Sequence, residues 1–385
     1  MNIALFCDSY KPYISGVTVS VEILAKQLKS LGHTVYVFAP DYPGALDEEN
    51  VFRFPSLPTF YPGFRIAIPF SPKISRKLKS LDMDIVHCHS PFQLGLLGRR
   101  VAKKRGRPFV YTLHTLFDKY IHYAPFIPGP VAKKLMAEHI KRFCASASRV
   151  IVPSNYVRDH LLELGVTPRL EVVPTGVDIE AANALTGKGI RKKYGIPEDV
   201  VVLMYAGRLT KEKNLPFLLQ SFKLINEEIP KIFLMIVAGG PMRKELEDLA
   251  KELRIFERVV FCGEVAHPDI FDHFAASDIF VFSSTTETQG LVIAEAFSKG
   301  LPAVAVSASG VNEAIEDGVN GYLVKKEPEE FAKKVLWLIQ NEGERKRMGN
   351  NALKAAKERF SSLAYAKKVE KIYCECYTEL KRRSQ

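Results

Sequence analysis

The chain has few of the features that mark membrane-spanning, secreted or metal-binding proteins. No stretch approaches the roughly 18 consecutive apolar residues of a membrane-spanning helix, and Met1 leads directly into a strand-like segment without a basic leader. Only two of the six cysteines, Cys374 and Cys376, stand close together, so neither a disulfide framework nor a zinc site is indicated. We therefore expect reduced thiols and a cytosolic protein.

The composition is that of a globular protein with a large core. Apolar residues make up 47% and charged residues 25% of the 385 positions. Because this length exceeds the size at which single cores stop growing, we expect two domains. Helical periodicity is lost after residues 174–178, which indicates a junction there. We expect a first domain at 1–176, a second at 177–360, and a helix at 361–385 that packs back on the first.

The excess of positive charge is confined to the first half of the chain. Residues 1–170 contain 23 Lys and Arg against 12 Asp and Glu, an excess equal to the net charge of the whole chain, +11. Such asymmetry indicates an acidic partner for this half, either an anionic membrane surface or nucleic acid.

Short, nearly continuous apolar runs alternate with helical patterns along the whole chain. Runs of this kind are typical of parallel strands buried on both faces. The pattern predicts an α/β fold with two Rossmann-like, doubly wound domains that face each other across a cleft. The expected strands are 3–7, 34–39, 84–87, 109–113, 150–152, 201–205, 232–238, 259–262, 279–282 and 303–306.

Apolar residues at helical spacing separate these runs. The first such helix ends at Gly32, a typical C-terminal cap. The C-terminal segment 344–379 is helical throughout, with a break at 360–362. The other expected helices are 215–229, 244–253, 291–299 and 329–340.

A basic motif follows the strand at 201–205. Arg208 and Lys213 lie in the loop between this strand and the next helix, at the edge of the sheet where doubly wound folds bind ligands. The guanidinium group of an arginine can donate two hydrogen bonds to a phosphate group, and the ammonium group of a lysine supplies a compact positive charge. Both can stabilise the negative charge of a departing diphosphate. A surface turn with two solvated bases is the structural alternative.

An acidic motif follows the strand at 279–282. Glu287 lies in the loop, and Glu295 lies among apolar neighbours in the helix that begins at Gly290 and Leu291. The free N–H groups of a helix start attract anionic oxygens, and ribose hydroxyls would satisfy a carboxylate in apolar surroundings. A structural ion pair is the alternative for either glutamate.

Two elements of the first half complete the set of candidates. Gly16 lies in the loop after the first strand, where its small size would let the backbone approach a phosphate, although plain turn chemistry explains it as well. His114 ends another strand and is a candidate polar contact in the cleft, although a single histidine is often only structural.

Together these motifs resemble the retaining, nucleotide-sugar-dependent glycosyltransferases of family 4, which have the GT-B fold. The resemblance implies that Glu295 holds the ribose and that Arg208 and Lys213 hold the diphosphate. It further implies no metal and no cofactor, with the substrate UDP-glucose as the donor. The donor sugar would contact Glu287 and the loop after it, Thr288, Gln289, Gly290 and Leu291.

Within this family the first half looks most like the diacylglycerol α-glucosyltransferases. The matching segments are 8–12, 89–92 and 112–115, together with Asp118 and Tyr120. The resemblance implies that a hexose is transferred to a lipid acceptor, 1,2-diacylglycerol, at the cytoplasmic membrane surface. Leu113 and Phe117 depart from the pattern, where an aromatic residue and a tyrosine are commoner.

The basic residues of the first half support a membrane partner. One cluster, around residues 133–142, contains apolar residues between its basic positions, as in a helix that lies in a membrane interface. A solvated helix explains the cluster equally well. Its basic members are Lys133, Lys134, Lys141 and Arg142, and its apolar members are Val131, Leu135, Ile140 and Phe143.

Three other functions remain possible from the sequence. The same machinery suits a mannosyltransferase acting on a phospholipid or an enzyme with a soluble acceptor. A nucleotide-sugar epimerase would have a similar two-domain fold, but the pair Glu287 and Glu295 fits it poorly. Nucleic acid is not an expected partner, because the basic clusters lack interleaved aromatics and no recognised binding motif is present.

Overall fold

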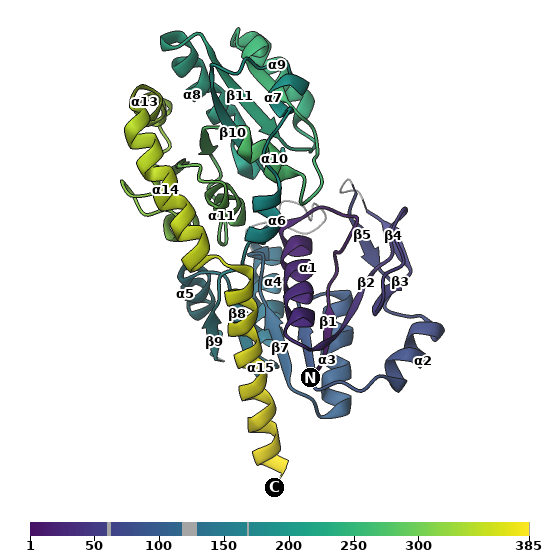
Figure 1. Ribbon diagram of the computed structural model, residues 1–385. Helices are drawn as coiled ribbons and strands as arrows, with labels where there is room; N and C mark the ends of the chain where they lie inside the picture. Colours follow the sequence, from purple (N-terminus) through teal and green to yellow (C-terminus); the bar gives the residue numbers. More distant parts are fainter. Residues whose placement is uncertain (60–62, 118–128, 168, 385) are drawn as a thin grey trace. The chain divides into compact units, whose positions relative to one another are not determined.

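The computed structural model describes residues 1–59, 63–117, 129–167 and 169–384 (Figure 1). The chain divides into two compact units, each with its own sheet. Unit 1 comprises residues 1–176 and 362–385, and unit 2 comprises residues 177–361. No helix among the described residues is both long enough and apolar enough to cross a bilayer.

Unit 1 contains a parallel sheet of seven strands in the order β3-β2-β1-β6-β7-β8-β9. The order reverses between β1 and β6, which is where open α/β sheets bind ligands at the carboxyl ends of their strands. The strands are β1 (Asn2–Phe6), β2 (Thr34–Pro40), β3 (Val51–Phe54), β6 (Ile85–Cys88), β7 (Phe109–Thr112), β8 (Arg149–Val152) and β9 (Leu170–Val172).

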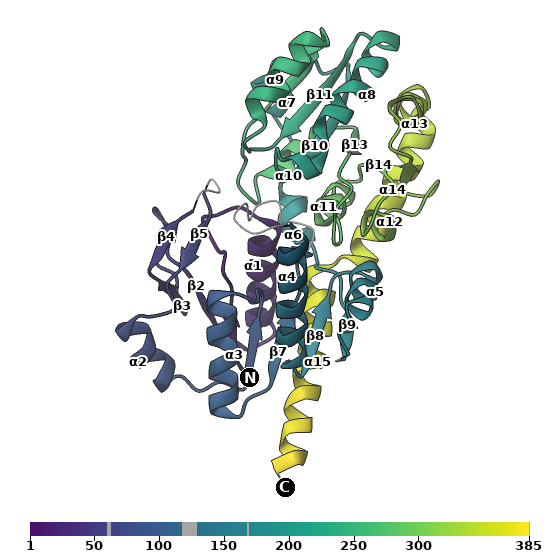
Figure 2. The same cartoon turned by 180° about the vertical axis from the view of Figure 1, so that it is seen from behind.

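Helices cover both faces of this sheet. Seen from opposite sides, α1 and α15 lie on one face and α3 and α4 on the other (Figure 1, Figure 2). On the α3–α4 face, Phe143 of α4 packs edge-on against Phe109 and Tyr111 of β7. The helices are α1 (Gly16–Ser30), α2 (Pro72–Ser80), α3 (Gln93–Arg105), α4 (Gly129–Ala145), α5 (Asn155–Glu163) and α15 (Ser362–Ser384), and a small antiparallel pair is formed by β4 (Ser56–Pro58) and β5 (Arg65–Ala67).

Local sequence explains where α1 begins and ends. Ser15 caps its first turn by accepting a hydrogen bond from the Thr18 N–H at 3.1 Å. At the other end Leu31 is the cap, and Gly32 follows it in the left-handed region at φ 85°. The predicted end at Gly32 is therefore one residue late, because the glycine lies just beyond the cap.

Unit 2 contains a parallel sheet of six strands in the order β12-β11-β10-β13-β14-β15. The order reverses between β10 and β13, so this sheet has its own switch point. The strands are β10 (Val201–Ala206), β11 (Ile232–Val237), β12 (Val259–Phe261), β13 (Ile279–Phe282), β14 (Ala303–Val306) and β15 (Gly321–Val324). The two sheet orders confirm the predicted doubly wound α/β fold.

The helices of unit 2 surround a large apolar core. They are α6 (Ile179–Ala184), α7 (Ile190–Lys193), α8 (Leu215–Glu228), α9 (Arg243–Glu252), α10 (Ile270–Ala275), α11 (Leu291–Ser298), α12 (Val311–Ala314), α13 (Pro328–Gln340) and α14 (Glu342–Arg359). The predicted break at 360–362 is confirmed, because α14 ends before it and α15 begins at Ser362.

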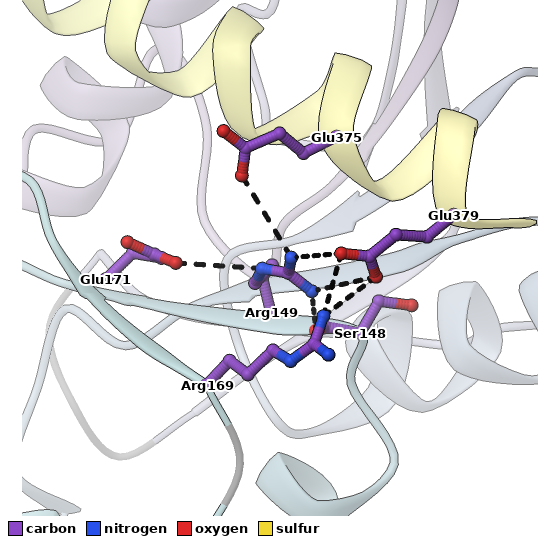
Figure 3. A network of polar contacts seen from close by, with 6 residues as sticks. All are labelled: Ser148, Arg149, Arg169, Glu171, Glu375 and Glu379. Atoms are coloured by element: carbon purple, nitrogen blue, oxygen red, sulfur yellow. Dashed lines mark hydrogen bonds and ion pairs between the residues drawn. The ribbon is translucent and has the colours of Figure 1, made fainter.

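The C-terminal helix α15 is held to unit 1 by a network of ions (Figure 3). Arg149, at the start of β8, has a side chain only 6% exposed and donates to Glu379 of α15 at 2.7 Å. Arg169 donates to the same carboxylate at 2.8 Å, while Glu171 and Glu375 lie 3.6 and 4.0 Å from Arg149. A largely buried arginine requires such partners, so the network fixes the position of α15 along the sheet.

Candidate functional site

Two loops meet at the switch point of unit 2. One follows β10 and the other follows β13, and these strands are neighbours in the sheet. The Ser283 hydroxyl donates to the Lys213 carbonyl at 2.7 Å, and the side-chain amide of Asn214 approaches the Ser283 carbonyl at 3.5 Å. The basic and acidic motifs are therefore brought together.

Lys213 and Glu287 form an ion pair between these loops. The ammonium lies 2.5 Å from Oε1 of the carboxylate, and the two side chains are only 17% and 16% exposed. Although burial raises the pKa of Glu287, the Lys213 ammonium beside it holds that pKa below its ordinary value. The structural ion pair expected as the alternative thus exists, and it places a cation where a diphosphate is expected.

The loop that contains Glu287 is shaped by a close contact with a glycine. The Gly310 N–H donates to the Glu287 carbonyl at 3.0 Å, and a Cβ on Gly310 would lie 2.4 Å from the Thr288 carbonyl oxygen. Gln289 is buried, and Gly290 has φ 75° where α11 begins at Leu291. The start of α11 is therefore held at the carboxyl edge of the sheet.

Glu295 lies one turn further along α11 and is 7% exposed. Burial raises the pKa of its carboxyl group to about 8, so the group is mostly protonated at pH 7. Nε2 of His267 lies 3.6 Å from its Oε1. His267 was not predicted from the sequence, where its only signal is its place in the loop after β12.

Arg208 lies in the same loop as Lys213 and is half-buried. The preceding Gly207 has φ 146°, and a Cβ there would lie 2.9 Å from the hydroxyl of Tyr205. A glycine is therefore required where the chain turns from β10 into this loop.

In unit 1, Gly16 and Asp8 lie at the carboxyl end of β1. A Cβ on Gly16 would have no atom within 4 Å, so the packing of the protein itself does not require a glycine there. Asp8 is buried and accepts hydrogen bonds from the Ser90 hydroxyl at 2.6 Å and the Leu94 N–H at 2.8 Å. These bonds join the loops that follow β1 and β6, at the switch point of this sheet.

His114 follows β7 at the same edge. Its Nε2 lies 3.0 Å from Nδ1 of His89, and the two rings are stacked with centroids 5.3 Å apart. Burial lowers the pKa of His114 to about 4, so the ring is neutral at pH 7. It is therefore not an isolated histidine but part of a buried cluster.

The predicted acceptor and membrane residues are only partly described. Asp118 and Tyr120 lie outside the described residues. The four basic residues of the α4 cluster, Lys133, Lys134, Lys141 and Arg142, are all exposed.

The predicted apolar stripe of α4 is wrong for half of its members. Val131 and Leu135 are 52% and 59% exposed, but Ile140 and Phe143 are buried. Phe143 faces the sheet because it packs on β7, so of the four predicted residues only the two in the first half of the helix are exposed to solvent.

The candidate residues are divided between the two units. In unit 2, Arg208 and Lys213 lie in the loop after β10, and Glu287 and Glu295 lie in the loop after β13 and in α11, with Lys213 and Glu287 in contact. Unit 1 holds Gly16 and His114. That the two groups face a common cleft stays a prediction. Among the described residues, no group of three or more His, Cys, Asp or Glu side chains is arranged to hold a metal ion.

Comparisons with known structures agree with the fold of this chain. Solved structures with a similar fold include the Anabaena protein HepE in complex with UDP and glucose, with a TM-score of 0.77 and 22% identity over 97% of this chain and 100% of that one. Sucrose-phosphate synthase from Thermosynechococcus elongatus has a TM-score of 0.78 and 18% identity over 98% and 99%. The predicted GT-B fold is confirmed.

Proteins related in sequence identify the family to which the chain belongs. The α-monoglucosyldiacylglycerol synthase of Acholeplasma laidlawii is 31% identical over 97% of each chain. The enzyme of the same name from Streptococcus pneumoniae is 32% identical over 84% of this chain and 75% of its own. Residues 14–181 match the family described as Glycosyltransferase Family 4, and residues 188–355 match Glycosyl transferases group 1. The predicted family is thereby confirmed, and the chain belongs to the glycosyltransferases of family 4.

Proposed function

We propose that the protein transfers glucose from UDP-glucose to 1,2-diacylglycerol, with retention of configuration and without a metal ion, at the cytoplasmic face of a membrane. The observation that carries the donor half is the group of Arg208, Lys213, Glu287 and Glu295 at one switch point. The acceptor half is supported by the two relatives named for the synthesis of monoglucosyldiacylglycerol.

The proposed donor site provides a polar or charged side chain for each part of a nucleotide sugar. In this proposal Glu295 receives the ribose hydroxyls, and Arg208 and Lys213 face the diphosphate. Lys213 already has a carboxylate 2.5 Å away, so it can bridge the diphosphate and Glu287 without moving far. Glu287 would then meet hydroxyl groups of the sugar.

The reaction needs no side chain as a nucleophile. The bond from the sugar C1 to the diphosphate oxygen breaks, and the oxygen of the acceptor hydroxyl bonds to C1 on the same face. The proton of that hydroxyl passes to the departing diphosphate. Preorganised cations beside the leaving group stabilise the charge that builds there, and removing one such contact typically lowers kcat by about 100- to 1000-fold.

Unit 1 has exposed apolar and basic side chains suited to an anionic membrane. Phe70 is 71% exposed at the end of the β4–β5 segment, directly before the basic helix α2. Each Lys or Arg near such a surface contributes about 1 kcal/mol. Other exposed apolar and basic residues of unit 1 are Leu57, Ile66 and Ile68, with Lys73, Arg76, Lys77 and Lys79 of α2, and Val131, Lys133, Lys134 and Leu135 of α4.

Turnover with defined substrates tests the proposal. The purified chain is given UDP-glucose, UDP-galactose or GDP-mannose, with diacylglycerol in vesicles that contain anionic lipid, and the anomeric configuration of the glycolipid is read by NMR. We expect an α-glucosyl product from UDP-glucose, formed at the same rate with and without a chelator of divalent metal ions. Turnover with a soluble acceptor and none with lipid would contradict diacylglycerol as the acceptor. Conversion of the donor sugar into another sugar in the absence of any acceptor would indicate an epimerase.

Vesicle binding tests the membrane surface separately. We expect Phe70→Ser to weaken binding to anionic vesicles, while Trp337→Ser in unit 2, where the tryptophan is 49% exposed, leaves it unchanged. Added salt should release the protein, since exposed charges are screened beyond about 8–10 Å. Binding that resists salt, or equal effects of the two substitutions, contradicts this surface.

A further inference from the structure

A cluster of buried polar side chains lies beneath the carboxyl edge of the unit 1 sheet. His87 of β6 and Thr112 of β7 point to one face, because side chains alternate along a strand and His87 pairs with Val110, two residues before Thr112. His89 and His114 lie just beyond the ends of these strands and join the same cluster through their ring contacts. The same face packs on α15, from which Tyr373 reaches the cluster. His87, His89, Thr112 and Tyr373 are all buried.

These side chains form a continuous set of contacts. The Tyr373 hydroxyl lies 2.6 Å from Nδ1 of His87, and Nε2 of His87 lies 2.7 Å from the Thr112 hydroxyl. The ring of His87 is therefore fixed on both sides. His89 packs on it with ring centroids 4.1 Å apart and bonds to His114 through Nδ1 at 3.0 Å.

Protonation of the cluster follows from its burial. Burial lowers the pKa of His87 to about 3 and holds the pKa of His89 well below its ordinary value, so each ring is neutral and carries one N–H. Burial also raises the pKa of the Tyr373 hydroxyl, which keeps its proton. Tyr373 can then donate to Nδ1 of His87, whose Nε2–H donates to Thr112.

The position of the proton on His89 decides the next bond. Nε2 of His89 is buried and has no hydrogen-bond partner among the described residues. A buried N–H without a partner is rarer and more costly than an acceptor without one, so the proton of His89 belongs on Nδ1. It then donates to Nε2 of His114.

From this geometry we propose that Tyr373, His87 and His89 are positioning residues that hold His114 in the tautomer with its proton on Nδ1. Nε2 of His114 is then occupied as an acceptor, so this nitrogen does not act as a base toward a substrate. The role of His114 toward a substrate rests on the proposed function; its tautomer does not.

The C-terminal helix has a direct part in this arrangement. Tyr373 lies less than two turns before Glu379, whose bonds to Arg149 and Arg169 fix the helix along the sheet (Figure 3). The network of ions around Arg149 therefore helps to place the Tyr373 hydroxyl beside His87.

NMR of the full-length protein labelled with ¹⁵N-histidine tests the tautomer directly. His114 is assigned by the signals lost in His114→Ala, and at pH 7 we expect its proton on Nδ1. In His89→Phe, which keeps a flat ring but removes the donor, we expect the other tautomer to become populated. A proton on Nε2 of His114 in the unaltered protein, or no change in His89→Phe, overturns the proposal.

Tyr373→Phe tests the support from α15. We expect it to broaden or shift the His89 and His114 signals and to lower kcat about tenfold, while KM for the sugar donor stays unchanged. Tyr365→Phe, at another buried tyrosine of α15, is the matched control and should leave the signals of both rings in place. Equal spectral changes in the two variants overturn the role of Tyr373. If instead the spectra behave as expected but His114→Ala retains full activity, the tautomer stands and the proposed role of His114 fails.

Discussion

If the ribose binds Glu295 as proposed, the buried carboxyl group of this residue should make the binding of a nucleotide sugar dependent on pH. Its pKa of about 8 means that about 90% of the molecules carry a proton on this group at pH 7. Two ribose hydroxyls that donate to the group stabilise its ionised form. Binding should therefore release a proton, close to one per site at pH 7.

The size of the change in affinity with pH follows from the fraction of molecules in which Glu295 is ionised. That fraction is about 0.01 at pH 6 and about 0.5 at pH 8, and the apparent dissociation constant is the intrinsic one divided by it. We expect the affinity for UDP-glucose, measured by titration calorimetry without acceptor, to rise about 50-fold between these pH values. In Glu295→Gln the affinity should be weaker at pH 8 and nearly independent of pH.

Calorimetry in two buffers of different ionisation enthalpy counts the protons. UDP-glucose is suitable because its diphosphate has no proton that titrates near pH 7. Equal affinities at pH 6 and pH 8, or proton release that persists in Glu295→Gln, would refute the assignment of the ribose to Glu295.

Three further substitutions have defined outcomes. Gly310→Ala should weaken UDP-glucose binding at least tenfold in calorimetry, because the new methyl group displaces the Thr288 carbonyl. Lys213→Ala should lower kcat about 100-fold and destabilise unit 2 by about 3 kcal/mol in denaturant unfolding, since it leaves Glu287 without its cation. Glu379→Gln should speed amide exchange in the last turns of α15, with a loss of about 1 kcal/mol.

Matched controls separate these effects from general damage. Gly343→Ala should leave donor affinity unchanged, because a Cβ there has no atom within 4 Å. Lys211→Ala removes an exposed charge from the same loop as Lys213 and should retain activity. Glu375→Gln should change amide hydrogen exchange in α15 less than Glu379→Gln does, because the Glu375 carboxylate lies 4.0 Å from Arg149.

The strands that are buried on both faces of a sheet were predictable from the sequence, whereas the short, half-buried strands were not. The runs at β13 and β14 are continuous in apolar residues, and the predicted bounds match the structure. By contrast β3 carries Arg53, which bonds to Glu48 and the Lys11 carbonyl, and β9 has no buried residue. Such short, half-buried strands take their form from pairing with a neighbour, which sequence periodicity does not record.

In the candidate site, too, some residues were predictable from the sequence and others were not. Loops that follow neighbouring parallel strands must meet at one edge, so Arg208, Lys213 and Glu287 were identifiable from their place in the sequence. The bond between His89 and His114 depends on side chains 25 residues apart, and His267 approaches Glu295 from a different loop. Contacts of this kind become visible only once the strands are paired.

The return of α15 to unit 1 affects the order in which the chain becomes able to fold during synthesis. Unit 2 is one continuous segment, 177–361, so all of its residues have left the ribosome while unit 1 still lacks α15. Until that helix arrives, the face of the unit 1 sheet that carries His87 is without the hydroxyl of Tyr373 and the apolar side chains around it. The unit whose sequence begins first is thus the last to be completed, and its exposed sheet is a candidate substrate for chaperones in the interval.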